Sequence, residues 1–313
     1  ACGMPGIMLN SMGAGKLCAV GIFFLSGLVL KQAEATQAVS AAGALLFGVA
    51  TILGFTALLA PLCLHIPLQP EGLRLGLAIF CCVPTTLSSG IALTQTAGAN
   101  TAMALLLTVI SNVVGVFTMP FTIWWAVGSS VSISPVPLLQ SLVQTVMVPL
   151  LLGISARRMW PGLASFVDGR KKVVSKLQST LQIMVPWMQV SKSVTAFASL
   201  QLPSLVGVAI TGLAIHGVFL AFNSLAVRGL KLGGKPDNTE AVAIQRAVVI
   251  LGSQKTLPVA VAAIGSMNES LGGAAGLVVL PCIVCHIMQI IADSFLVSSW
   301  LKADSAARPR KPS

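Results

Sequence analysis

Two long apolar segments of this chain are each interrupted in the middle by proline and polar side chains. The first interruption lies in residues 81–96, CCVPTTLSSGIALTQT, and the second in residues 251–261, LGSQKTLPVAV. A bilayer offers no hydrogen-bond partner to a freed backbone group, so such breaks must face protein or a water-filled cavity. Interrupted spans in corresponding places of two half-chains are typical of the substrate and ion site of a transporter.

The composition places the chain in a membrane. Of its residues 55% are hydrophobic and 9% are charged, whereas about a quarter of the residues of an ordinary soluble domain are charged. The net charge of +11 does not indicate nucleic-acid binding, because the basic residues are not clustered with aromatics and Tyr is absent. The seven cysteines lie mostly in apolar runs, so we expect no disulfide framework.

Nine membrane spans are predicted from apolar windows of about 20 residues. They cover residues 17–30, 42–64, 73–96 (broken), 102–127, 137–153, 177–200, 204–227, 241–266 (broken) and 271–300. The sixth is amphipathic, with Gln178, Gln182, Gln189 and Lys192. Its polar face is expected to meet a cavity or other helices, and the alternative is a helix lying in the membrane interface.

The basic residues support this count. With nine alternating spans, one side receives fourteen of them: Lys31, Arg157, Arg158, Arg170, Lys171, Lys172, Lys176, Arg228, Lys231, Lys235, Lys302, Arg308, Arg310 and Lys311. The other side receives only Lys16 and Arg74. Such a bias predicts that the fourteen lie inside, together with the C-terminus.

An internal repeat accompanies the broken spans. Thr85-Thr86-Leu87 recurs 170 residues later as Lys255-Thr256-Leu257, and a loop asparagine follows each, at Asn100 and Asn268. A second half of five spans against a first half of four predicts repeats that are inverted in the membrane, with one N-terminal helix missing. The chain starts without Met, which fits an incomplete N-terminus.

The broken spans carry the candidate binding groups. Thr85, Thr86, Ser88, Ser89, Gln254 and Thr256 offer hard oxygen ligands beside Pro84 and Pro258. Free N–H and C=O groups at the helix breaks add an anion-binding and a cation-binding end. The alternative is that each hydroxyl only bonds to a carbonyl of the preceding helical turn.

Lys255 is the most informative single residue. A lysine near the middle of a span costs about 2.5 kcal/mol or more on insertion scales, so it has to meet water, carbonyls or an anion. It either binds an anionic substrate or replaces a bound cation with its ammonium. The alternative is a capping contact to carbonyls at a helix end.

Other polar residues in the spans have structural interpretations. We expect Arg246 to pair with Asp293, His216 to donate to a neighbouring helix, His65 to lie in a loop and Lys192 to reach the membrane surface. Cys282-Ile-Val-Cys285-His286 matches a haem-attachment pattern, but it lies in an apolar span, and no haem is expected. Motifs of an intramembrane enzyme are absent from the sequence.

The segments CCVPTTLSSGIALTQTAGAN, GSQKTLP and LPCIVCHIMQIIADS resemble the bile acid:sodium symporter family. They are most similar to its branch of plant plastid-envelope sodium/metabolite cotransporters and to an animal solute-carrier relative. The resemblance implies a ten-helix fold of two inverted repeats, with a panel domain and a core domain. The fourth and ninth helices of that fold are unwound and cross each other, and this chain would lack the first helix.

The resemblance also implies two sodium sites. The first would use Ser88, Ser89 and Thr108, with one ligand lost at Ala104. The second would use Gln254 and the backbone at Leu251 and Ser253, with a carboxylate replaced by Ile250. These departures weaken sodium binding. The hypothesis is that the Lys255 ammonium stands in for one sodium ion, so that fewer sodium ions, or none, are coupled.

The sequence therefore predicts an all-α polytopic membrane protein that is not an enzyme and that transports small organic anions by alternating access, with sodium as the candidate coupling ion. The expected substrate contacts are Pro84, Thr85, Thr86, Lys255, Thr256 and Pro258. Alternatives are a sodium-independent carrier and a non-transporting regulator of ion homeostasis. A monomer is expected. The resemblance to the plastid branch implies a location in the plastid inner envelope, with the C-terminus in the stroma.

The expected organisation has four parts. Residues 1–153 hold the first repeat and one helix of the second, 154–176 form a basic inside loop, 177–301 complete the second repeat, and 302–313 are a basic tail. The panel and core domains would interleave along the chain.

Overall fold

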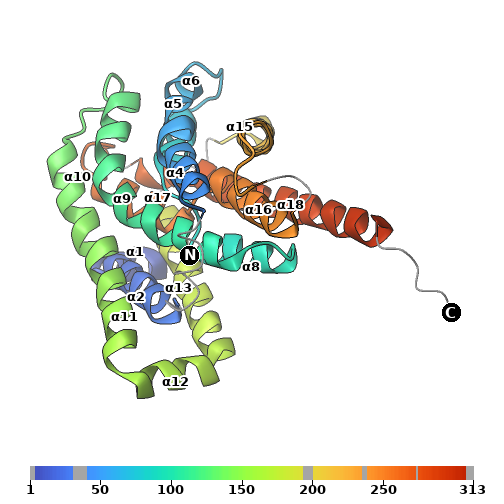
Figure 1. Cartoon of the computed structure of the whole chain (residues 1–313). Helices are drawn as coiled ribbons and strands as arrows, with labels where there is room; N and C mark the ends of the chain where they lie inside the picture. Colours follow the sequence, from blue (N-terminus) through green and yellow to red (C-terminus); the bar gives the residue numbers. More distant parts are fainter. Residues whose placement is uncertain (1–3, 31–40, 193–199, 235–237, 273, 308–313) are drawn as a thin grey trace.

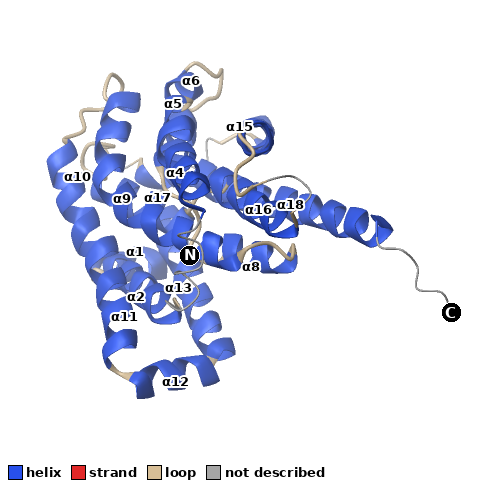
Figure 2. Ribbon diagram, viewed as in Figure 1, coloured by secondary structure: helices blue, strands red, loops and turns tan. Residues whose placement is uncertain are grey.

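The computed structural model describes residues 4–30, 41–192, 200–234, 238–272 and 274–307, and it is helical without strands over these ranges (Figure 2). Lys31, residues 193–199 of the sixth predicted span, Lys235, Arg308, Arg310 and Lys311 lie outside the described residues, and so does the side chain of Lys192.

The helices follow the predicted spans closely, and several are divided into pieces. In chain order they are α1 (Met4–Ser11), α2 (Ala14–Val29), α4 (Ala42–Ala50), the π-helix η3 (Thr51–Phe55), α5 (Thr56–Leu58), α6 (Ala60–Leu64), α7 (Glu71–Cys82), α8 (Ser89–Thr96), α9 (Thr101–Val127), α10 (Pro135–Leu142), the π-helix η4 (Val143–Met147), α11 (Val148–Met159), α12 (Pro161–Gly169), α13 (Lys171–Lys192), α15 (Leu202–Gly229), α16 (Thr239–Ser253), α17 (Leu257–Ser266) and α18 (Ala275–Ala307).

Six of the described helical stretches are long and apolar enough to cross a membrane: Ala42–Leu64, Thr101–Val127, Pro135–Met159, Leu202–Gly229, Thr239–Ser266 and Ala275–Ala306. The three other predicted spans differ from these for identifiable reasons. Helix α2 has only 16 residues, and α13 carries many polar side chains. Helices α7 and α8 are separated by residues 83–88, a longer break than residues 254–256 within Thr239–Ser266. The count of nine spans and the inverted repeat therefore remain predictions.

Helix α2 packs against α11 and α13, and these three helices lie with α12 in the lower part of Figure 1. Two glycines permit the closest of these contacts. A Cβ atom on Gly27 of α2 would lie 2.3 Å from the Leu150 carbonyl oxygen, and one on Gly153 of α11 would lie 2.2 Å from the Phe24 carbonyl oxygen. Small residues allow such close helix approach where lipid provides no hydrophobic driving force between helices. We call α1, α2 and α10–α13 the α2 group.

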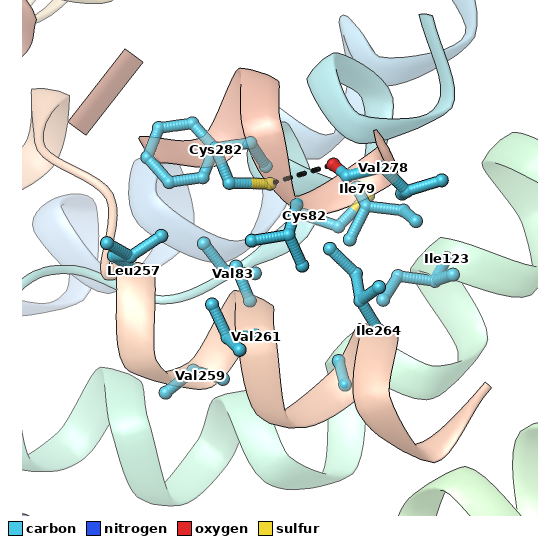
Figure 3. Packing of buried hydrophobic residues seen from close by; sticks show 14 of the residues in the cluster. Ile79, Cys82, Val83, Ile123, Leu257, Val259, Val261, Ile264, Val278 and Cys282 are labelled. Atoms are coloured by element: carbon cyan, nitrogen blue, oxygen red, sulfur yellow. Dashed lines mark hydrogen bonds between the residues drawn. The ribbon is translucent and has the colours of Figure 1, made fainter. Parts of the chain in front are cut away.

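The broken helices lie beside the α2 group, together with α4–α6, α9, α15 and α18 (Figure 1). Their apolar side chains pack into a continuous core at the end of α7. Figure 3 shows Ile79, Cys82 and Val83 against Leu257, Val261 and Ile264 of α17, and Cys282 of α18 beside them. This packing holds the end of α7 against α17 and α18.

Candidate functional site

The two breaks predicted from the sequence meet in space. Residues 83–88 separate α7 from α8, and residues 254–256 separate α16 from α17. The amide of Thr256 donates to the carbonyl oxygen of Pro84 at 3.0 Å, so one non-helical segment is hydrogen-bonded to the other. We call residues 83–88 and 254–256 the crossover.

Proline explains both interruptions. Val83 precedes Pro84 and is extended (ψ 155°), because a residue before proline is disfavoured in the helical region. Pro258 lies in the first turn of α17, a position where its missing N–H group costs nothing. The chain thus leaves one helix and starts the next without a lost hydrogen bond at Pro258.

Thr85 and Lys255, which the repeat aligns, make corresponding contacts across the crossover. The Thr85 hydroxyl donates to the Leu251 carbonyl near the end of α16 at 2.6 Å. The Lys255 ammonium donates to the Val83 carbonyl after the end of α7 at 2.8 Å. Each break therefore satisfies a helix-end carbonyl of the other.

A side-chain amide supports each break from the helix that follows it. Asn112 of α9 donates through Nδ2 to the Thr85 carbonyl at 3.1 Å. Gln289 of α18 donates to the Lys255 carbonyl at 2.7 Å and accepts from the Lys255 amide at 2.9 Å. Sequence reasoning did not assign Asn112 or Gln289 to the site, although both are polar residues inside apolar helices.

The Lys255 side chain is 1% exposed, and three oxygen atoms surround its ammonium. These are the carbonyl oxygens of Ile52 (2.6 Å) and Val83 (2.8 Å) and the hydroxyl of Thr56 (2.6 Å). The three hydrogens of an ammonium are matched by three acceptors. In this conformation Lys255 therefore binds two helix carbonyls and one hydroxyl, as the capping interpretation expects, and has no hydrogen left for a substrate. None of the three acceptors is among the expected sodium ligands, so the cation-replacement interpretation remains a hypothesis.

The π-helix η3 makes one of these acceptors available. The Thr56 amide donates to Thr51, five residues back, instead of to Ile52 as an α-helix requires. The Ile52 carbonyl is left to the Thr56 hydroxyl and to Lys255. Single π-helical turns of this kind are frequent at functional sites.

Gln254 connects the crossover to Asp293 and His216, two residues that sequence reasoning did not assign to the site. Its Oε1 accepts from the hydroxyls of Thr86 (3.0 Å) and Ser89 (3.4 Å), and its Nε2 donates to the Asp293 carboxylate of α18. The other Asp293 oxygen lies 2.8 Å from Nε2 of His216, on α15.

The predicted pairing of Arg246 with Asp293 is wrong. Arg246 instead forms two 2.7 Å hydrogen bonds with Asp304, because α18 continues to Ala307 and presents Asp304 to α16 about three turns beyond Asp293. The expectation for His216 is confirmed, since it contacts the neighbouring helix α18 at Asp293. Its Nδ1 also lies 3.2 Å from the Ser253 carbonyl.

The expected substrate contacts are enclosed by protein in this conformation. Pro84, Thr85, Thr86, Lys255, Thr256 and Pro258 are all buried. Among the expected sodium ligands, Ser89 and Gln254 contact each other, and Thr108 donates to the Ala104 and Thr86 carbonyls. Ser88 is exposed and lines a cavity. Ala104 and Ile250 are fully buried.

One cavity lies beside the second half of each broken helix. The α8 cavity, of about 320 Å³, is lined by Ser26, Val29, Leu30, Leu87, Ser88, Ile91, Ala92, Gln95, Leu105, Lys171, Ser175 and Gln178. The α17 cavity, of about 170 Å³, is lined by Gly13, Gly15, Lys16, Ala19, Ser141, Thr145, Val185, Gln189, Val261, Ala262, Gly265 and Ser266. Both lie between the α2 group and the broken helices.

Helix α13 lines both cavities with its polar face, through Gln178 and Gln189. This agrees with the prediction that its glutamines meet a cavity. The cysteines of the CxxCH pattern are packed in the core: Cys282 donates to the Gly76 carbonyl, and Cys285 lies against Gly212. His286 approaches the Lys255 carbonyl at 3.2 Å.

Comparison with known proteins agrees with this architecture. A model of the SBF-like CPA transporter family matches residues 2–302. The chain belongs to this family. The SBF-like family is one of transporters, not enzymes.

Curated relatives resemble this SBF-like chain along most of its length. A rice protein (Oryza sativa subsp. japonica) named probable sodium/metabolite cotransporter BASS4, chloroplastic, is 42% identical over 310 residues, which are 96% of this chain and 71% of the rice protein. The Arabidopsis thaliana protein of the same name is 41% identical over 92% of this chain and 66% of its own length. Sodium/bile acid cotransporter 7-B of Xenopus laevis is 26% identical over 90% of this chain and 81% of its own.

Proposed function

We propose that this chain is a secondary active transporter of small organic anions that works by alternating access. The observation that carries the proposal is the crossover, a hydrogen-bonded meeting of two broken helices with one cavity beside α8 and another beside α17. Such a pair of access routes around one central structure is what alternating access requires. The six proposed substrate contacts, Pro84, Thr85, Thr86, Lys255, Thr256 and Pro258, frame this centre and become accessible as the α2 group moves.

The charges of the cavities favour an anionic substrate. Lys171 is the charged residue lining the α8 cavity and Lys16 that lining the α17 cavity, and neither set of described lining residues includes an acid. The larger cavity is at the lower end of the ~300–1,000 Å³ range of small-molecule sites. Ser88, at the start of α8, adds the positive end of a helix to this cavity.

Lys255 is proposed to act as a built-in cation. Its ammonium is held only by oxygen atoms, the ligand type that sodium prefers. These belong to Ile52, Thr56 and Val83, and Lys255 directly follows Gln254, one of the expected sodium ligands. One coupling ion is thereby replaced, and weak sodium binding at Ser88, Ser89 and Thr108 is retained. A carrier that does not use sodium at all is the second candidate, and the same Lys255 contacts favour it.

The location follows from the relatives, two of which are named chloroplastic. We propose a plastid envelope membrane, with Lys171 and the C-terminal end of α18 on the stromal side. This orientation places the α8 cavity toward the stroma and the α17 cavity toward the opposite side.

Counterflow in liposomes tests the function. Purified protein would be reconstituted, and exchange of labelled carboxylates and sulfonates would be measured in sodium chloride and in choline chloride. We expect exchange of at least one anion, with weak dependence on sodium in the wild type and stronger dependence in Lys255→Gln. A wild type without any sodium dependence would favour the second candidate. The exposed Lys302→Gln is the control. A regulator that transports nothing would give no exchange with any anion, and unchanged sodium dependence in Lys255→Gln would refute the built-in cation.

A further inference from the structure

A directional chain of hydrogen bonds runs from α15 to the start of α8. His216 contacts Asp293, Asp293 accepts from Gln254, and Gln254 accepts from Thr86. The Thr86 hydroxyl oxygen in turn accepts from the Gly90 amide at 2.8 Å, in the first turn of α8. This chain joins three helices, α15, α18 and α8, through both breaks.

The carboxylate decides the direction of the chain. An ionised carboxylate has acceptors only, so the NH₂ group of Gln254 has to face Asp293. The carbonyl of the same amide then faces Thr86 and Ser89, which must donate to it. If the Gln254 amide were reversed, two acceptors would face each other beside Asp293, at a cost of about 1–3 kcal/mol for a buried unsatisfied group.

Direction matters at the start of α8. With its own hydrogen given to Gln254, the Thr86 oxygen is free to accept from Gly90. With the amide reversed, the NH₂ group and the Gly90 amide would both donate to the Thr86 oxygen, and the buried Thr86 hydroxyl hydrogen would lose its acceptor. The Thr86 hydroxyl, which holds the start of α8 where Ser88 lines the α8 cavity, would then no longer be fixed by Gln254.

Burying these polar side chains costs free energy, so their presence at this depth indicates a role. Asp293 and Gln254 are fully buried, and His216 is 5% exposed. A buried carboxylate is tolerated only when it is paired and hydrogen-bonded. An apolar side chain in place of Asp293 would need no hydrogen-bond partners at that depth. It would, however, leave the Gln254 amide free to adopt either orientation.

We propose that Asp293, held by His216, is a positioning residue that fixes the orientation of the Gln254 amide and thereby the start of α8 beside the α8 cavity. The effect of this positioning on anion binding rests on the proposed transport function, but the positioning of α8 itself can be tested separately. Asp293 reaches the cavity only through Gln254 and Thr86.

The test compares Asp293→Asn with Asp304→Asn on the same helix. Asparagine keeps the size and hydrogen-bonding capacity of Asp293, but it can offer either a donor or an acceptor, so the Gln254 amide is no longer forced into one orientation. We expect amide hydrogen exchange in residues 86–93 to become about tenfold faster in Asp293→Asn, the size of one lost charge-assisted hydrogen bond. In Asp304→Asn this segment should exchange as in the wild type.

Transport gives the second readout. The KM for the exchanged anion should rise about tenfold in Asp293→Asn while the maximal rate changes less, whereas a merely structural role would lower the amount of active protein at unchanged KM. If Asp293→Asn cannot be purified, His216→Gln should shift exchange in the same direction by a smaller factor. If amide hydrogen exchange in residues 86–93 is the same as in the wild type in both Asp293→Asn and His216→Gln, the positioning role would be overturned. If amide hydrogen exchange in residues 86–93 is altered in the variants but the wild type transports no anion, only the transport function would be overturned.

Discussion

The ammonium of Lys255 lies 2.8 Å from the carbonyl oxygen of Val83, so a charge from the second half of the chain caps the broken helix of the first half. The Thr85 hydroxyl makes the corresponding contact in the other direction, with Leu251. These reciprocal contacts are those that an inverted repeat would produce, and they tie the stability of the crossover to a small number of polar groups.

Removing the Lys255 ammonium leaves the buried Val83 carbonyl and Thr56 hydroxyl oxygens without this donor, whereas the Ile52 carbonyl keeps the Thr56 hydroxyl. We expect purified Lys255→Ala to melt several degrees below the wild type in choline chloride, because each buried unsatisfied acceptor costs about 1–3 kcal/mol. Sodium chloride should restore part of the loss, since a sodium ion can occupy the vacated position. Melting followed by tryptophan fluorescence at matched ionic strength checks this, and equal melting temperatures in the two salts would argue against a cation site.

Thr85→Val removes one hydroxyl at nearly constant volume. The Leu251 carbonyl then lacks the donor that lies 2.6 Å from it, and we expect a destabilisation of about 1–3 kcal/mol. Thr96→Val is the matched control, because Thr96 is exposed and bonds only to the preceding turn of its own helix. Denaturant titration of both variants decides the matter, and an equal effect of the two would contradict a special role for Thr85.

The closing of the α17 cavity can be tested by cross-linking. The hydroxyls of Ser141 on α10 and Ser266 on α17 are 2.6 Å apart, joining the α2 group to a broken helix. A Ser141→Cys/Ser266→Cys protein, with its native cysteines replaced, should form a disulfide under mild oxidation and stop anion exchange, which reduction restores. Each single cysteine variant is the control. Undiminished exchange by the cross-linked protein would show that these helices do not separate during transport.

Packing of α2 against α11 depends on the absence of a side chain at Gly153. A methyl group there would lie 2.2 Å from the Phe24 carbonyl oxygen, so Gly153→Ala should force the helices apart and lower the melting temperature. Gly217→Ala is the control, since a Cβ at Gly217 of α15 meets no atom within 4 Å. Side-by-side melting curves test this, and a Gly153→Ala variant as stable as Gly217→Ala would contradict the close approach.

Much of the architecture could be predicted because its determinants are local. Proline and hydroxyl residues within apolar runs identified both breaks, and apolar length predicted most helix boundaries to within a few residues. The meeting of the two breaks was predicted from interrupted spans at corresponding places in the two halves, whereas the contact between Thr86 and Gln254 was not.

What could not be predicted depends on helix rotation and length. Asp293 was assigned to Arg246 because depth in the membrane was known only approximately, and the long extension of α18 brought Asp304 to Arg246 instead. Two of the three acceptors of Lys255 come from Ile52 and Thr56, about 200 positions earlier in the chain. A π-helical turn has no sequence signature that would have identified them.

The π-helix η3 has an evolutionary consequence. A π-helical turn amounts to one additional residue in an α-helix, and deleting one residue from Thr51–Phe55 would let Thr56 bond to its usual acceptor. The flanking part of the helix would then rotate by about 100°, the angle that one residue occupies in an α-helix. A homologue one residue shorter in this stretch would lack a place for a buried ammonium, and we expect such proteins to carry an uncharged side chain where this one has Lys255.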